Sequence, residues 1–276
     1  MILMNINFVI SLVNANVRRS HINNEFSKRN IPFQFFDALQ PSVLLEQYIA
    51  TTLPGLKVAN LSEGEKACFM SHMALWEKLA NSKNNYMAIF EDDVILGKNA
   101  DKLFSSYDWL EERFALNDNL IIRLETSCIA VKRVGSEVEN VLERKFSLLD
   151  SEEFGMAGYI LSRKAAVFLL DYFKSLDGKS IKAIDKYLFG DLIRNNNLHI
   201  YQLEPAICIQ EDKLNKKKST LISQLEYDRR RIENNNKKQE NKGIIYMIYK
   251  LLTKWKRMKE KKRSEQERLN NMIKFE

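Results

Sequence analysis

The chain has 276 residues, of which 45% are hydrophobic, and it carries a formal net charge of +7. This apolar content can fill the core of a globular domain, which excludes an intrinsically disordered chain. The three cysteines are odd in number and far apart, which argues against a disulfide framework or a zinc site and favours a reducing cytosol.

The positive charge is concentrated in the last part of the chain. Residues 211–276 hold 20 Lys and Arg against 10 Asp and Glu, whereas residues 1–210 hold 23 Lys and Arg against 26 Asp and Glu. The body is therefore slightly acidic and the tail is basic. This asymmetry indicates a partner for the tail.

The first part of the chain alternates predicted strands and helices. The apolar run 8–13 predicts a strand rather than a signal peptide, because it lacks a basic start and a small-residue cleavage site. Residues 20–29 predict a helix and residues 32–38 a second strand. The prolines and glycine within residues 40–60 indicate a loop-rich segment.

A longer helix is predicted to begin at Ser62, which forms a capping box with Glu65. Its apolar residues recur at helical spacing. Cys68 and Trp76 fall one turn either side of His72 and are expected to be core contacts on the same helical face.

Three consecutive acids, Glu91, Asp92 and Asp93, interrupt the apolar strand predicted over residues 88–96. Adjacent carboxylates repel one another and need a positive partner if they are buried. A hard cation such as Mg²⁺ or Mn²⁺ suits carboxylate oxygens and also suits a phosphate-bearing substrate. Ligands of α/β proteins bind at the carboxyl ends of strands, which fits this position. The alternative is a solvated turn.

Further strands are predicted over residues 119–124, 158–162 and 199–203, and a helix follows the second of them. Strands that alternate with helices predict a largely parallel α/β sheet covered on both faces.

The tail has a different pattern. After a polar hinge at residues 234–239, apolar residues recur at helical intervals through 244–255, with Lys250, Lys254, Lys256 and Arg257 beside them. A helix of this kind lies in the interface of an anionic membrane, and it is too short and too charged to span one. The alternatives are that it packs on the body or pairs with a second chain.

Several sequence blocks lie in order along the body: 36–38 (Phe-Asp-Ala), 61–72 with Trp76, 90–94 (Phe-Glu-Asp-Asp-Val), 158–162 with Ala165 and Ala166, and Ile184-Asp185. Together they resemble glycosyltransferase family 25, the lipooligosaccharide galactosyltransferases and their collagen-modifying relatives. The similarity covers about residues 6–210. Lys66, Gly158 before the Tyr, and the lack of Pro before Ile184 depart from the family pattern and leave the substrate open.

The resemblance implies a GT-A-like single α/β domain around a mostly parallel Rossmann-like sheet, here residues 1–215, with the basic amphipathic helical tail at 216–276. It also implies an inverting transfer of a sugar, commonly galactose from UDP-galactose, to a lipooligosaccharide or related glycan.

The resemblance further implies roles for single residues. Asp93 is expected to bind the Mn²⁺ or Mg²⁺ that bridges the donor phosphates, while Glu91 or Asp92 contacts the ribose or supports the metal. Ser71 and His72 match a family block and are expected at the donor site, although a histidine on such a helix is often a packing residue.

Inversion requires a general base for the acceptor hydroxyl. Asp185 is the first candidate because the family match falls on it, with Glu153 and Glu125 as alternatives. A structural role for Asp185, as an N-cap or an ion pair with Lys182 or Lys186, is the competing interpretation.

The turn after the first strand lies where GT-A folds receive the nucleotide. Asn14, Arg18 and Arg19 are therefore expected at the donor site, with an arginine on a phosphate or on the uracil edge. Exposed helix arginines are the commoner outcome. Gln210, after the last strand, is expected on the acceptor side.

The sequence thus predicts a cytoplasmic, metal-dependent glycosyltransferase held by its tail at the inner face of the bacterial plasma membrane. One alternative is a metal-dependent nucleotide-sugar hydrolase that uses the same acids. Another is a nucleic-acid-binding protein, which is disfavoured because the tail's cations accompany an aliphatic and Trp-bearing stripe rather than a stacking platform.

Overall fold

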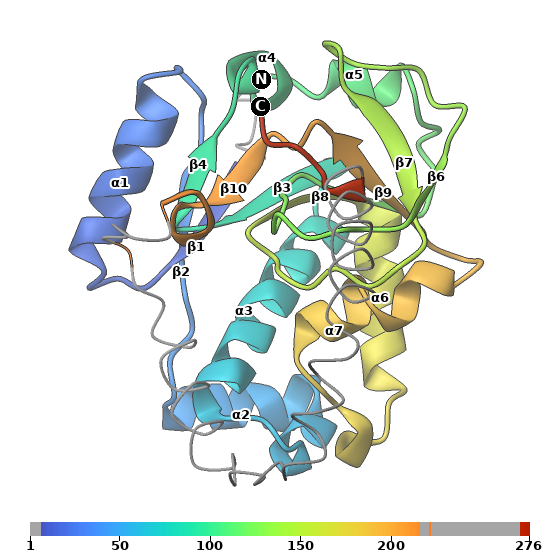
Figure 1. Cartoon of the computed structure of the whole chain (residues 1–276). Helices are drawn as coiled ribbons and strands as arrows, with labels where there is room; N and C mark the ends of the chain where they lie inside the picture. The colour runs from blue at the N-terminus through green and yellow to red at the C-terminus, as the bar shows by residue number, and fades with distance from the viewer. Residues whose placement is uncertain (1–6, 216–220, 222–270) are drawn as a thin grey trace, which may run out of the picture.

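An eight-stranded sheet forms the centre of the described part of the chain, residues 7–215, 221 and 271–276 of a computed structural model (Figure 1). Its strand order is β2-β1-β3-β8-β5-β9-β7-β6, and β4 and β10 form a separate two-stranded ribbon. The strands are β1 (Asn7–Ser11), β2 (Gln34–Asp37), β3 (Tyr86–Glu91), β4 (Val94–Leu96), β5 (Leu120–Arg123), β6 (Arg133–Gly135), β7 (Lys145–Leu149), β8 (Gly158–Ser162), β9 (His199–Glu204) and β10 (Cys208–Gln210).

The predicted mostly parallel sheet is confirmed in the direction of its strands. In the described ranges, β7 and β8 alone run against the other strands of the eight-stranded sheet. Both reversed strands lie inside the sheet, so antiparallel pairs separate the parallel groups. The strands β6 and β7 were not predicted. They pair with each other as a local antiparallel unit, which needs no crossover helix.

Helices cover both faces of the sheet (Figure 1). One core lies between the sheet and α2, α3, α6 and α7, and the other between the sheet and α1, α4 and α5. Strand β3 serves both, because Met87 and Ile89 belong to the first core and Ala88 and Phe90 to the second. The helices are α1 (Asn16–Ser27), α2 (Val43–Thr52), α3 (Glu63–Ala80), α4 (Ala100–Phe104), α5 (Asp108–Glu111), α6 (Arg163–Lys174), α7 (Ile184–Leu188) and α8 (Glu211–Leu214), with 3₁₀ turns at Pro54–Val58, Gly178–Ser180 and Asp191–Arg194.

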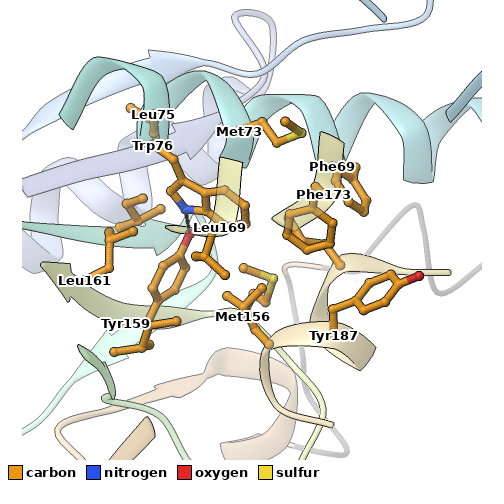
Figure 2. Close-up of a cluster of buried hydrophobic side chains, with 14 of the residues drawn as sticks. Phe69, Met73, Leu75, Trp76, Met156, Tyr159, Leu161, Leu169, Phe173 and Tyr187 are labelled. Carbon is orange, nitrogen blue, oxygen red and sulfur yellow. Dashed lines mark hydrogen bonds between the residues drawn. The ribbon is translucent and has the colours of Figure 1, made fainter. Parts of the chain in front are cut away.

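An aromatic cluster joins α3, α6 and α7 (Figure 2). Phe173 of α6 meets Phe69 edge to face at a centroid distance of 5.0 Å and stacks on Trp76 at 5.8 Å. Tyr187 of α7 packs edge to face against the same Phe173 at 5.2 Å. Such pairs add to the burial of the rings themselves. The cluster therefore fixes α7, which carries Asp185, relative to α3.

The prediction of a loop-rich segment over residues 40–60 is wrong. Helix α2 occupies much of it, and Ser42 caps this helix by accepting a hydrogen bond from the Leu45 N–H at 3.1 Å. The prolines mark the ends of the helix rather than an absence of structure. The capping box of α3 is confirmed, since Ser62 Oγ accepts from the Glu65 N–H at 3.2 Å and Glu65 Oε2 from the Ser62 N–H at 3.0 Å.

The described end of the tail packs on the body. Met272 bridges to Ala130, and the Ile273 carbonyl accepts a hydrogen bond from Thr126 Oγ1 at 2.8 Å. Ile273 is 1% exposed and belongs to the core. The predicted hinge at 234–239 and the amphipathic stretch after it lie outside the described residues, so the boundary at 215/216 stays a prediction. No helix in the described ranges is long and apolar enough to cross a bilayer.

Candidate active site

The three acids lie at the edge of the sheet where β1, β3 and β5 end. Glu91 is the last residue of β3 and pairs in register with Ile10 of β1, while Asp92 and Asp93 form the turn into β4. The strand predicted over 88–96 is therefore two strands, because the acids turn the chain away and β4 pairs with β10 instead. Asp92 and Asp93 are 7% and 5% exposed, which excludes a solvated turn.

Two neighbours from the β1–α1 unit hold Asp92. Ser11 Oγ donates a hydrogen bond to Asp92 Oδ2 at 2.7 Å, and the Arg18 guanidinium forms an ion pair with Asp92 Oδ1. The Arg18 side chain is 22% exposed, so the pair is partly shielded from water. The positive partner that buried acids require is thus supplied by α1.

Asp93 is less completely neutralised. Its Oδ2 lies 3.5 Å from Arg18 Nη2, while its Oδ1 is buried without a hydrogen-bond partner in the described part of the chain. Burial raises the pKa of Asp93 to about 6, although the charge of Arg18 opposes this shift. Asp93 therefore keeps one carboxylate oxygen free for a further ligand.

Glu91 faces the β10 side of the site. Gln210 donates from Nε2 to Glu91 Oε2 at 3.2 Å, which places Gln210 beside the acids. Burial, and then the charges of Asp93, Glu125 and Asp92, raise the pKa of Glu91 well above its ordinary value. Glu91 thus holds its proton more firmly than an exposed glutamate does.

The residues present fit a divalent cation whose remaining ligands come from a bound substrate. No group of three or more His, Cys, Asp or Glu in the described ranges is arranged to hold a metal ion. Mg²⁺ typically needs only one or two carboxylates when substrate phosphates supply further oxygens. The buried and unpartnered Oδ1 of Asp93 is a suitable ligand of this kind.

Arg19 and Asn14 lie in the first turn region but do not contact the acids. Arg19 is ion-paired with Asp37 of β2, donates to the Ser11 carbonyl at 3.0 Å, and lies over the Phe35 ring at 4.7 Å. Asn14 is exposed in the turn between β1 and α1. Arg18, rather than Arg19, is therefore the arginine that the fold brings to the acidic triplet.

Ser71 and His72 are buried within α3. Ser71 Oγ accepts from the Leu39 N–H at 2.9 Å and donates to the Ala67 carbonyl at 2.8 Å. His72 Nδ1 lies 2.9 Å from the Tyr159 hydroxyl, which also accepts from Trp76 Nε1 at 3.0 Å. Burial lowers the pKa of His72 to about 3, so the ring is neutral.

A second charged cluster lies at the end of β5. Arg123, Glu125 and Glu153 are 0%, 1% and 0% exposed. Arg123 Nη1 lies 2.7 Å from Glu153 Oε2, and Arg123 Nη2 lies 3.3 Å from Glu125 Oε1. Glu153 Oε1 also accepts from the Ser127 N–H at 3.0 Å. Burial raises the pKa of Glu125 to about 7, against the opposing charge of Arg123.

Asp185 is half-buried in the first turn of α7. Its Oδ1 accepts from the Lys186 N–H at 3.0 Å, while Lys182 pairs with Asp191 at 2.7 Å. The N-cap position of α7 belongs to Ala183. Asp185 is therefore not the N-cap residue, and among the described residues it forms no ion pair with Lys182 or Lys186.

Sequence reasoning placed the segment that begins at Ser11 at the donor site but did not predict the contact of Ser11 with Asp92, and it assigned no role to Arg123. Ser11 was visible as the polar residue that ends the first apolar strand, at the same sheet edge as the acids. Arg123 follows three apolar residues and resembles an exposed strand end in the sequence. Its burial depends on Glu153, which no local pattern connects to it.

The chain matches a family model and several characterised sequences. The model Glycosyltransferase family 25 (LPS biosynthesis protein) matches residues 4–188. The lacto-N-neotetraose biosynthesis glycosyltransferase LgtB of Neisseria meningitidis serogroup A is 42% identical over 97% of this chain and 98% of its own length. LgtE of serogroup B is 44% identical over 95% and 94%, and the lipooligosaccharide biosynthesis protein lic2B of Haemophilus influenzae is 44% identical over 89% and 91%.

Solved structures are more distant. A glycosyltransferase involved in the glycosylation of the major capsid of PBCV-1 aligns with a TM-score of 0.38 at 7% identity, over 81% of this chain and 97% of the other. Membership of a family is shown by the family match and by near-full-length identity above 40%. The chain is a member of glycosyltransferase family 25.

Proposed function

We propose that this chain transfers galactose from UDP-galactose to a lipooligosaccharide or related glycan acceptor, with inversion at the anomeric carbon. Relatives that span nearly the whole chain bear the names of lacto-N-neotetraose and lipooligosaccharide biosynthesis proteins, which supports the acceptor class. The observation that carries the proposal is the buried acidic turn after β3, with Arg18 beside it, at the carboxyl ends of β1 and β3.

In the proposed mechanism, the donor diphosphate lies against Arg18 and the acidic turn. Asp93 would hold a Mn²⁺ or Mg²⁺ ion through its unpartnered oxygen. When bound, such an ion offsets the negative charge that develops on the departing diphosphate. Arg18 contributes a second positive charge at the same place, and Asp92 and Ser11 hold it there. Glu91 is proposed to contact the ribose, and Gln210, which donates to Glu91, is proposed to line the acceptor side next to it.

Asp185 is the proposed general base. Inversion in one step needs a carboxylate that removes the proton of the acceptor hydroxyl as it attacks the anomeric carbon. Asp185 is half-buried and carries no ion pair to Lys182. The second candidate, Glu153, is fully buried and paired with Arg123, so it is a poorer base in this arrangement. We retain Asp185 for the role.

Two pairs of residues are proposed to serve donor recognition in different ways. They are Asn14 with Arg19, and Ser71 with His72. Asn14 in the β1–α1 turn and Arg19 in the first turns of α1 are proposed to meet the nucleotide base by side-chain rotation. Ser71 and His72 are buried in α3 and act, in this proposal, by holding Leu39 and Tyr159 in place.

The experiment is a panel of UDP-sugars with Mn²⁺, read as UDP release with and without a lipooligosaccharide-type acceptor. We expect release from UDP-galactose that depends on the acceptor. Asp93→Asn should lower the turnover number by about 100-fold while the far-UV spectrum stays unchanged. Asp101→Asn on the exposed surface of α4 is the control. Release at the same rate without acceptor would instead indicate a nucleotide-sugar hydrolase, and a near-normal rate in Asp93→Asn would contradict the role of Asp93.

We further propose that the basic tail holds the enzyme, with no nucleic-acid partner, at the cytoplasmic face of the plasma membrane. Because residues 271–276 pack on the body, the test uses substitutions in the full chain rather than truncation. Lys254→Glu with Lys256→Glu should reduce flotation with anionic liposomes. Flotation equal to that of the unmodified chain would contradict the anchor.

A further inference from the structure

Arg123, Glu125 and Glu153 form a buried charged cluster next to the acidic triplet. All three side chains are enclosed, and two acids face one arginine. Glu125 Oε2 is buried without a hydrogen-bond partner in the described part of the chain. Buried ion pairs are weak contributors to stability because desolvation offsets their attraction. The cluster therefore calls for an explanation other than stability.

The cluster is connected to the helix that carries Asp185. Arg123 Nη1 contacts Glu153 Oε2 at 2.7 Å, and the Glu153 N–H donates to the Phe189 carbonyl at 3.1 Å. The Phe189 N–H in turn donates to the Asp185 carbonyl at 2.9 Å. The Arg123 guanidinium also lies 5.1 Å from the centre of the Phe189 ring, within cation–π range. Arg123 therefore holds the end of α7 by two kinds of contact.

The same cluster is connected to the acidic turn. Arg123 Nη2 lies 3.3 Å from Glu125 Oε1, which accepts from the Ala157 N–H at 2.8 Å. The Ala157 carbonyl accepts from the Glu91 N–H at 2.9 Å. One residue of the loop before β8 thus joins Glu125 to Glu91.

That loop is shaped around the cluster. Gly155 has φ +117°, a conformation that side-chain-bearing residues rarely adopt. A Cβ atom there would lie 3.2 and 3.3 Å from the two carboxylate oxygens of Glu125. Arg123 Nη2 and Ser127 Oγ both donate to the Phe154 carbonyl, at 3.2 and 3.1 Å. The loop is therefore closely fitted to the charged side chains beneath it.

We propose that Arg123 is a positioning residue, which through Glu153 and Glu125 fixes the placement of Asp185 relative to Glu91 and so of the acceptor base relative to the donor site. The catalytic part of this inference rests on the proposed function, whereas the linkage itself does not. Small displacements of a positioned catalytic group cost large factors in rate.

Hydrogen exchange tests the linkage without any substrate. Lysine keeps the positive charge but lacks the planar fork that reaches Glu153, Glu125 and Phe154 together. Arg123→Lys should therefore accelerate exchange of the Glu91 and Phe189 amides by at least about threefold. Arg163→Lys is the matched control, because Arg163 is exposed and its guanidinium donates to the Ser82 carbonyl, away from the cluster. Unchanged exchange of both amides would overturn the proposal whatever the donor sugar.

Steady-state kinetics tests the catalytic consequence. We expect Arg123→Lys to lower kcat by about tenfold with less than about threefold change in the KM of donor or acceptor. In an Asp185→Asn background the same substitution should have almost no further effect on kcat, because it acts through Asp185. Losses that multiply in the double variant would contradict this and indicate a general structural effect. Absence of transfer by the unmodified chain would refute the proposed function and leave the exchange result to decide the linkage.

A milder variant covers the case in which Arg123→Lys does not fold. Ser127→Ala removes the hydrogen bond to the Phe154 carbonyl and the one accepted from Arg123 Nη2, and it leaves every charge in place. It should accelerate exchange of the Phe189 amide and lower kcat, both by smaller factors than Arg123→Lys does. In the Asp185→Asn background it should again leave kcat unchanged. Wild-type exchange and wild-type kcat in this variant would count against the proposal.

Discussion

Arg18 of α1 is ion-paired with Asp92 in the turn after β3, and so joins two parts of the chain that lie 74 residues apart. Arg18 also reaches Asp93 at 3.5 Å and donates to the Leu221 carbonyl at 3.1 Å. The neighbouring Arg19 points to Asp37 instead. Two consecutive arginines of one helix thus have separate partners, which makes each the control for the other.

Arg18→Gln should weaken binding of the nucleotide sugar. The substitution removes the charge that opposes the rise in the pKa of Asp93, so Asp93 should be protonated more often near neutral pH. We expect the donor KM to rise by about tenfold, which corresponds to roughly 1.4 kcal/mol. Arg19→Gln should change it by less than about threefold. Equal effects of the two substitutions, measured by initial rates against donor concentration, would contradict the separate roles.

His72→Gln should make the free energy of unfolding less dependent on pH under acidic conditions. Burial lowers the pKa of His72 to about 3, so the folded state keeps the ring neutral while the unfolded chain takes up a proton below about pH 6.5. Stability from this group is complete above pH 6.5 and falls by about 1.4 kcal/mol per pH unit towards pH 3. Urea unfolding between pH 7 and pH 4.5 measures it. The variant should be less stable than the unmodified chain at pH 7, and its free energy of unfolding should fall less steeply as the pH is lowered to 4.5.

The matched control for this prediction is His199→Gln, because His199 is exposed at the start of β9. It should follow the unmodified chain at every pH. An acid limb of His72→Gln as steep as that of the unmodified chain would show that other groups account for the loss.

Much of the fold was predictable because helix-capping residues and apolar runs in the sequence mark the helices and strands that form. Ser62 and Glu65 mark the start of α3, and the apolar runs match β1, β3, β5, β8 and β9 within a few residues. The segment over 40–60 was misjudged because its prolines were interpreted as loop signals rather than as helix boundaries. Strand β6 was missed because it has only three residues, of which Val134 alone is a large apolar one, whereas β7 was missed although three of its five residues are apolar.

The candidate site was predictable where charged residues follow directly on an apolar strand. Three acids after an apolar strand are visible in the sequence, and the structure buries two of them beside Arg18. The burial of Arg123 was not predictable, because its partner Glu153 lies in a loop whose course depends on Gly155. Pairings of this kind are decided by tertiary packing and leave no periodic signal in the sequence.

Glu125→Gln should flatten the dependence of stability on pH near neutrality. Burial raises the pKa of Glu125 to about 7, so the folded state holds a proton that the unfolded chain releases above about pH 4.5. The contribution is complete below pH 4.5 and is lost as the pH rises through 7. Asp93 and Glu91 shift in the same direction, so the slope should be reduced rather than abolished. Thermal melting between pH 5 and pH 8 measures it, and an unchanged slope would contradict the shift.

Gly97→Ala should displace residues 271–276 from the body. A Cβ atom at Gly97 would lie 2.0 Å from the Glu276 carbonyl oxygen, which also accepts from Arg144 Nη2 at 2.6 Å. Backbone atoms must therefore move, and we expect a loss of about 2 kcal/mol in the free energy of unfolding. Gly135→Ala is the control, because in the described part of the chain no atom beyond the adjacent residues lies within 4 Å of a Cβ placed there.

Gly97→Ala should also change hydrogen exchange at specific amides. The Ala206 and Val131 amides donate to the Lys274 and Asn271 carbonyls at 2.7 and 3.1 Å, and both should lose protection from hydrogen exchange when the segment leaves. The Val9 amide, deep in β1, should keep its protection. If Gly97→Ala unfolds at the same denaturant concentration as Gly135→Ala, and Ala206 and Val131 exchange as slowly as before, residues 271–276 are not a fixed part of the body.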